Sequence, residues 1–174
     1  MTDKLFVYVD GTARGAPGEA AIGVVLTDKD GNVIQERSRL IGRATALVAE
    51  YRALIEGCRL AQEHAPTSVI LFTNNQQLAN HVNGVFHTRR PNLTHLIHEA
   101  KSLLNAFPQW RVNYIDRAAN RLAPRLVERA YHNRIQEKVA RQRLQALLLS
   151  RTAELSEDDL RRVLEFADGL QAES

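Results

Sequence analysis

The chain has 174 residues, of which 44% are hydrophobic and 25% charged, a balance typical of a globular protein with a core of its own. Its single cysteine, Cys58, excludes an internal disulfide, and no apolar run is long enough for a signal peptide or a membrane span. We therefore expect a cytoplasmic protein without a membrane partner. The formal charge is +3, with the basic excess before residue 131, which permits binding to a phosphate backbone without requiring it.

Three strands are predicted at the start of the chain. Alternating β-branched and aromatic residues predict a strand over 5–11, and the Gly- and Pro-containing stretch 13–20 predicts a loop. A second strand is expected over 20–28 and a third over 32–41, joined by a turn that ends at Gly31. Strands connected by such short turns pair antiparallel, so these three form a meander.

Helices and strands alternate in the next part of the chain. Apolar residues at helical spacing indicate the helices, and short apolar runs indicate buried strands. The expected elements are a helix over 45–64, a strand over 68–73, helices over 74–84 and 93–107, a strand over 110–116 and a helix over 120–149. A meander followed by alternating elements predicts an α/β fold, in which helices flank a five-stranded mixed sheet.

Residues 132–174 have a pattern of their own, so we expect a domain over 1–131 and a C-terminal helical extension over 132–174. Ser156 followed by Asp159 is typical of a helix start, and the apolar residues after it lie on one helix face. The preceding helix also has an apolar side. A helical hairpin is therefore predicted, whose stripes pack on the chain itself or form a homodimer interface.

Five stretches of the chain resemble the type 1 ribonuclease H family, above all its bacterial and archaeal branch. In order, they are VDGTARGAPGEAAIGVVL, RATALVAEYRALIEGCRLA, NNQQLANHVNG, RPNLTHLIHEAKSLL and NRLA. The resemblance implies a five-stranded mixed sheet whose first three strands are antiparallel. It also implies hydrolysis of the RNA strand of an RNA/DNA hybrid. In that chemistry two Mg²⁺ (or Mn²⁺) ions are held by a cluster of four carboxylates.

Only two of the four positions that the resemblance assigns to carboxylates hold one. Asp10 matches the position on the first strand and Glu50 the position on the first helix. The third position is Asn74, which has no charge, and the fourth is Pro124, which has no side-chain ligand. Two neighbouring divalent ions repel, and a fuller carboxylate set offsets their charge. We therefore expect at most one weakly held ion, at Asp10 and Glu50, and cleavage that is lost or impaired.

Simpler structural roles exist for the two substituted positions. Asn74 can cap the helix that follows it, and Pro124 can initiate the last helix of the domain. Glu128, one turn after Pro124, is a hypothetical replacement for the missing carboxylate. His95 and His98 share a helix face, but no further ligand completes a zinc pattern around them.

At the positions where the family contacts a hybrid, this sequence has some of the family's residues and lacks others. The resemblance assigns Thr45 to a phosphate of the DNA strand and Gln76 to the groove. Two groove-reading asparagines of the family are Ala46 and Leu47 here. A basic loop at Arg89 and Arg90 adds cations that can contact phosphate. The positions expected to contact nucleic acid are Thr45, Gln76, Arg89 and Arg90.

Three functions remain open at this point. The first is binding of nucleic acid, an RNA/DNA hybrid or structured RNA, with cleavage lost or impaired. The second is an active Mg²⁺-dependent ribonuclease H with an altered site, favoured by Asp10, Glu50, Thr45 and Gln76. The third is a non-catalytic scaffold or oligomerisation module, favoured by the apolar stripes of the C-terminal helices and by Leu47.

Overall fold

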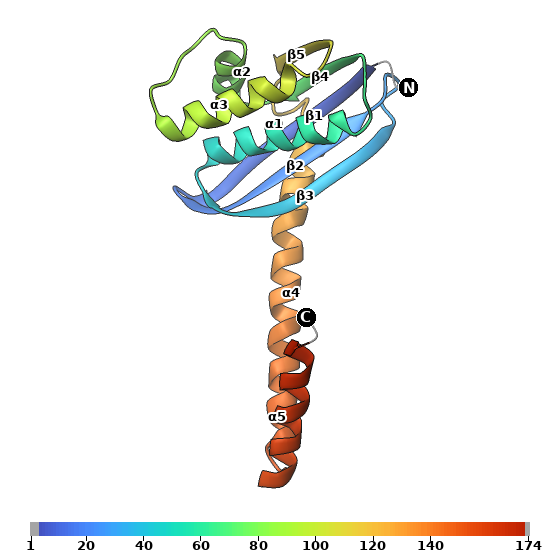
Figure 1. Cartoon of the computed structure of the whole chain (residues 1–174), viewed down its shortest axis with the longest axis vertical. Coiled ribbons are helices and arrows are strands. Elements are labelled where there is room, and N and C mark those ends of the chain that lie inside the picture. Colours follow the sequence, from blue (N-terminus) through green and yellow to red (C-terminus); the bar gives the residue numbers. More distant parts are fainter. Residues whose placement is uncertain (1–3, 173–174) are drawn as a thin grey trace. The chain divides into compact units, whose positions relative to one another are not determined.

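A five-stranded mixed sheet with the strand order β3-β2-β1-β4-β5 forms the centre of the first part of the chain (Figure 1). The computed structural model describes residues 4–172. The first three strands pair antiparallel, whereas β4 runs parallel to β1 and β5 parallel to β4, as expected. The strands are β1 (Lys4–Gly15), β2 (Gly18–Thr27), β3 (Val33–Ala44), β4 (Ser68–Thr73) and β5 (Gln109–Tyr114).

Helices cover both faces of the sheet because the strand residues alternate in direction. On one face, apolar residues such as Val7 and Val9 form the main core with α1 (Ala46–Gln62) and α3 (Pro91–Leu104). On the other face, Ala21 packs against Val127 and Tyr131 at the start of α4 (Leu122–Thr152). The short helix α2 (Gln76–Val82) follows β4 and also packs into the main core.

The expected loop over 13–20 is wrong, because this stretch forms the tip of a β-hairpin. The ladder between β1 and β2 continues to the pair Gly15 and Gly18, so only Ala16 and Pro17 remain for the turn. A Cβ on Gly18 would lie 1.9 Å from the carbonyl oxygen of Arg14. The glycines therefore serve a tight turn and not a long loop.

The chain divides into two units, Met1–His132 and Asn133–Ser174, and α4 runs from the first into the second. The second unit contains the rest of α4 and α5 (Glu157–Ala172), which form the predicted hairpin. The Asp159 N–H donates to the Ser156 hydroxyl at 3.3 Å, so the predicted helix start is confirmed. None of the helices within residues 4–172 has both the length and the apolar composition needed to cross a membrane. The functional division at residue 131 stays a prediction.

Candidate functional site

Asp10 lies on β1 at a point where two helices approach the sheet closely. A Cβ on the next residue, Gly11, would lie 2.3 Å from the carbonyl carbon of Ala49 in α1. A Cβ on Gly23, which pairs with Asp10 on β2, would lie 2.2 Å from the carbonyl oxygen of Ala123 in α4. The two glycines therefore let α1 and α4 meet the sheet on its opposite faces beside Asp10.

Glu50 reaches the site because α1 begins four residues before it. The Val48 N–H donates to the Thr45 hydroxyl at 3.3 Å, so Thr45 is the N-cap of α1. Asp10 and Glu50 are each only 8% exposed. One oxygen of Glu50, Oε2, is buried and has no hydrogen-bond partner. Both matched carboxyl groups are therefore poorly hydrated.

Burial raises the pKa of both carboxyl groups, and this loss of hydration is the largest cause for each. The pKa of Glu50 lies well above its usual range, and the neighbouring Asp10 charge adds to the rise. The positive charge of Arg117 and a hydrogen bond from Asn74 oppose the rise in the pKa of Asp10. Two buried carboxylates that repel each other create a place where a cation would be stabilised.

Asn74 directly follows β4, at the position that the resemblance assigns to the third carboxylate. Its Oδ1 accepts a hydrogen bond from Nδ2 of Asn120 at 3.0 Å, and its side chain also hydrogen-bonds Asp10. The expectation that Asn74 caps the next helix is wrong. Asn75 is the N-cap of α2, since its Oδ1 accepts from the Leu78 N–H at 3.0 Å. The helix begins one residue later than the pattern suggests, which leaves Asn74 facing the site.

Asn120 and Arg117 are two residues of the site that sequence reasoning missed. Asn120 is 1% exposed, and its Nδ2 also donates to the Val9 carbonyl at 2.9 Å. It thus links β1, the residue after β4 and the segment before α4. The sequence did give one indication of Asn120, because this residue begins the stretch NRLA that resembles the family. Arg117 lies between β5 and α4, and its charge acts on both Asp10 and Glu50. No local pattern indicated that placement.

Pro124 is the third residue of α4, so the interpretation as a helix-initiating proline is confirmed. Its missing N–H costs nothing there, because the first N–H groups of a helix have no partner within the helix. Glu128, one turn further, pairs with Arg14 at 3.5 Å and its side chain is 72% exposed. Its charge still raises the pKa of Asp10. Replacement of the missing carboxylate by Glu128 stays a hypothesis.

The donor set does not fit the two-ion centre that the resemblance implies. Within residues 4–172 no group of three or more His, Cys, Asp or Glu side chains is placed to hold a metal ion. The Oδ1 of Asn74 is engaged by Asn120, and Pro124 offers no ligand. The carboxylates of Asp10 and Glu50, including the unpartnered Oε2, leave hard oxygen ligands for one ion at most.

The residues expected to contact nucleic acid lie at the starts of helices or in a connection. Thr45 is exposed before α1, and Gln76 is the exposed first residue of α2. Leu47, in place of a groove-reading asparagine, packs against the main core and so cannot serve the same purpose. Arg89 and Arg90 are both exposed between α2 and α3. Their contacts with nucleic acid stay predictions.

Comparison with known proteins gives the family. A family model described as reverse transcriptase-like matches residues 8–130. Over 127 residues the chain is 35% identical to a ribonuclease HI of Halobacterium salinarum, an alignment that covers 73% of this chain and 64% of that protein. The chain belongs to the type 1 ribonuclease H family. The family and fold expected from the sequence are therefore confirmed.

This ribonuclease H-like chain is also similar to a bifunctional protein of Mycobacterium tuberculosis. The two are 33% identical over 128 residues, which cover 73% of this chain and 35% of that protein. The ribonuclease H1 named LC11, solved in complex with an RNA/DNA hybrid, is 32% identical with a TM-score of 0.72. That match covers 75% of this chain and 99% of the solved chain. The chain spans less than two thirds of the length of the two curated relatives, the ribonuclease HI of Halobacterium salinarum and the bifunctional protein of Mycobacterium tuberculosis.

Proposed function

We propose that this ribonuclease H-like domain binds nucleic acid, an RNA/DNA hybrid or structured RNA, and that its cleavage is lost or impaired. The observation that carries the proposal is the hydrogen bond between Asn74 and Asn120 at the third carboxylate position. A neutral amide adds no charge to offset a second ion, and its oxygen is already engaged. With Pro124 at the fourth position, two-ion hydrolysis lacks half of its ligands.

Binding is supported by groups that do not depend on the metal. Thr45 and Gln76 are exposed at the starts of α1 and α2, next to the elements that carry the carboxyl pair. Arg89 and Arg90 are exposed cations that suit phosphate contacts, which position a protein on a duplex without reading its sequence. LC11 ribonuclease H1, a relative, was solved with an RNA/DNA hybrid. A cytoplasmic location is part of the same proposal.

A binding and cleavage assay with the full chain tests this proposal. Labelled RNA/DNA hybrid, double-stranded RNA and single strands are titrated at several salt concentrations, and the same hybrid is incubated with Mg²⁺ and then Mn²⁺. We expect binding that weakens as salt rises, because counterions are released from the phosphates, and no cleavage beyond that of an Asp10→Asn variant. Absence of binding to every one of these probes at low salt would remove the proposal.

The alternative of an active enzyme with an altered site is favoured by one observation. Asp10 and Glu50 interact strongly enough for the charge of one to raise the pKa of the other, and Oε2 of Glu50 lacks a partner. A single Mg²⁺ held by Asp10 and Glu50 would polarise a phosphate oxygen when bound. Asp10 and Glu50 would hold that ion in place through their carboxylate oxygens. Cleavage by the natural protein that Asp10→Asn abolishes would favour this alternative.

Homodimerisation through the second unit is a further proposal, which supports a scaffold role. All described residues of this unit are at least partly exposed, including large apolar side chains such as Leu147, Leu164 and Phe166. Residues 133–152 of α4 are mainly basic, whereas α5 is mainly acidic. Two copies would bury the apolar faces and match the charges. Light scattering of the natural chain and of Leu147→Glu/Leu164→Glu decides this, since only the natural chain is expected to dimerise.

A further inference from the structure

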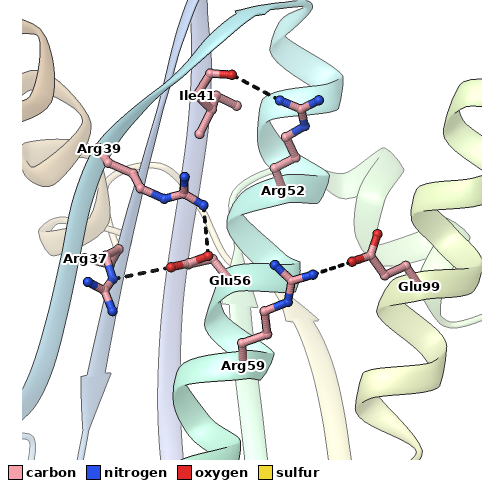
Figure 2. Close-up of polar contacts among 7 residues, drawn as sticks. All are labelled: Arg37, Arg39, Ile41, Arg52, Glu56, Arg59 and Glu99. Carbon is pink, nitrogen blue, oxygen red and sulfur yellow. Dashed lines mark hydrogen bonds and ion pairs between the residues drawn. The ribbon is translucent and has the colours of Figure 1, made fainter. Parts of the chain in front are cut away.

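A pocket of about 520 Å³ lies between β3, α1 and α3, on a part of the surface to which neither the sequence analysis nor the family comparison assigned a role. Figure 2 shows the polar network around it, with arginines from β3 and α1 and glutamates from α1 and α3. The charged and titratable residues that line the pocket are Arg39, Arg52, Glu56, Arg59, His95 and Glu99.

The network carries more positive than negative charge. The single carboxylate of Glu56 is shared by Arg37 at 3.3 Å and Arg39 at 3.1 Å (Figure 2). One positive charge of these three residues is therefore left over. Arg52 contacts a neutral group, since its Nη1 donates to the carbonyl of Ile41 at 3.1 Å. Arg59 and Glu99 form a balanced pair, so the network has a formal excess of two positive charges.

The arginines are held in place but still offer donors to a ligand. Glu56 is mostly buried, with its side chain 13% exposed, whereas the side chains of Arg39 and Arg59 are about half exposed, at 51% and 54%. Each guanidinium has five N–H donors in a planar fork, and the contacts described above use only one or two of them. Such a fork matches the geometry of phosphate oxygens.

A purely structural role explains this network less well. Exposed ion pairs contribute little to stability, and tying β3 to α1 would require only matched pairs of charges. The pocket lining itself has three arginines against two glutamates, and Arg37, which shares the carboxylate of Glu56, adds the second surplus positive charge. The surplus positive charge is therefore the feature that points to a ligand.

We propose that this pocket binds backbone phosphates of a nucleic-acid strand that extends beyond the carboxyl pair, an inference that rests on the proposed nucleic-acid binding. Arg52 holds the carbonyl of Ile41, four residues before Thr45, so the pocket adjoins the segment where the first phosphate contact is expected. Arg52 and Arg59 lie seven residues apart on α1, about 10 Å along the helix axis. That separation suits a row of phosphates better than a single small anion.

The test uses the full chain with Arg52→Gln and Arg59→Gln together, and labelled RNA/DNA hybrid as the probe. Affinity is measured over a salt series, with thermal unfolding to verify that the variant is folded. We expect binding to weaken at least tenfold at low salt, and the slope of log K against log salt to fall by roughly one to two. Replacement of both residues by lysine keeps the charge and should retain most of the slope.

Arg161→Gln is the matched control, because Arg161 also pairs with a glutamate but lies in α5. It should leave the affinity for hybrid unchanged. A folded double glutamine variant that binds hybrid like the natural chain, with the same slope, overturns the inference while leaving the proposed function in place. If the natural chain binds neither the hybrid nor double-stranded RNA nor single strands at low salt, the proposed function fails instead. In that case inorganic phosphate is added, and the melting temperatures of the natural chain and of the double glutamine variant are compared. If phosphate raises the melting temperature of the natural chain only, the pocket binds free anions, and the nucleic-acid assignment is overturned.

Discussion

The Oδ1 of Asn74 accepts a hydrogen bond from Nδ2 of Asn120, at 3.0 Å, where the family would place a metal-binding carboxylate. The same Nδ2 donates to the carbonyl of Val9 at 2.9 Å, one residue before Asp10. An amide has thus become part of an internal network that joins the three segments around Asp10. These hydrogen bonds hold the three segments together around Asp10.

Removal of the Asn120 side chain should therefore destabilise the domain. Asn120→Ala breaks one buried and one partly buried hydrogen bond and leaves the Val9 carbonyl and Asn74 without their donor, at a cost of about 2–3 kcal/mol. Urea unfolding followed by circular dichroism measures this. Asn92→Ala, at an exposed position in α3, is the control and should change stability by less than about 0.5 kcal/mol. Equal stabilities for the two variants would contradict the structural role of Asn120.

Gly23 should tolerate no side chain, because α4 lies directly on it. A Cβ there would lie 2.2 Å from the Ala123 carbonyl oxygen and 2.9 Å from Cβ of Leu126. Gly23→Ala should therefore lower the free energy of unfolding by about 2 kcal/mol or more, since backbone has to move. Gly169→Ala in α5 meets no atom within 4 Å and should instead stabilise its helix by up to about 1 kcal/mol. Thermal unfolding of both variants tests whether Gly23→Ala lowers the stability while Gly169→Ala raises it.

Neutralising Glu50 should stabilise the protein at neutral pH in the presence of EDTA. Burial raises the pKa of Glu50 in the folded state, so its contribution to stability is present below the unfolded pKa and is lost as pH rises through the folded pKa. At pH 7 the carboxyl group therefore opposes folding, because the folded chain must either bury its charge or take up a proton. Glu50→Gln should raise the free energy of unfolding at pH 7, with a smaller gain at pH 4.

Glu137→Gln, at an exposed position of α4, serves as the control for that pH series and should follow the natural chain. A Glu50→Gln variant that is less stable than the natural chain at pH 7 would mean that the carboxylate has a stabilising partner, such as Arg117, strong enough to outweigh its burial.

The affinity for Mg²⁺ should rise when position 74 carries a carboxylate. Asn74→Asp adds a third charged oxygen ligand beside Asp10 and Glu50, so it should bind Mg²⁺ at least about tenfold more tightly than the natural chain. Thermal unfolding with and without Mg²⁺ reports this, because a ligand that binds the folded state raises its melting temperature. A melting-temperature rise in the natural chain as large as that in the variant would show that the amide is no obstacle to the ion.

Much of the fold followed from local patterns, whereas details of the site depended on packing. Apolar periodicity and the family resemblance predicted the sheet, with Asp10 on its first strand and Glu50 on the first helix. The start of α2 was misplaced by one residue because Asn74 and Asn75 are equally good caps on chemical grounds. Only the folded chain shows that Asn75 takes that role. Asn74 was thereby freed for the site.

The arginine pocket had no signal in the linear sequence. Arg39 and Arg52 belong to separate elements, and each alone looks like an ordinary solvated residue. Their proximity depends on how β3 packs beside α1, and the surplus charge appears only when the shared carboxylate of Glu56 is seen. Arg117 is similar, because the path of the connection before α4 brings it to the carboxyl pair.

We propose that cleavage is lost or impaired because positions 74 and 124 lack carboxylates. The most direct measurement is the rate of hybrid cleavage in Mg²⁺ by the natural chain, by Asp10→Asn and by Asn74→Asp/Pro124→Asp. Aspartate also suits the first turn of α4, so the double variant should fold. We predict cleavage by the double variant alone, with the natural chain at the level of Asp10→Asn. Cleavage by the natural chain at a rate that Asp10→Asn abolishes and the double variant does not exceed would contradict the account.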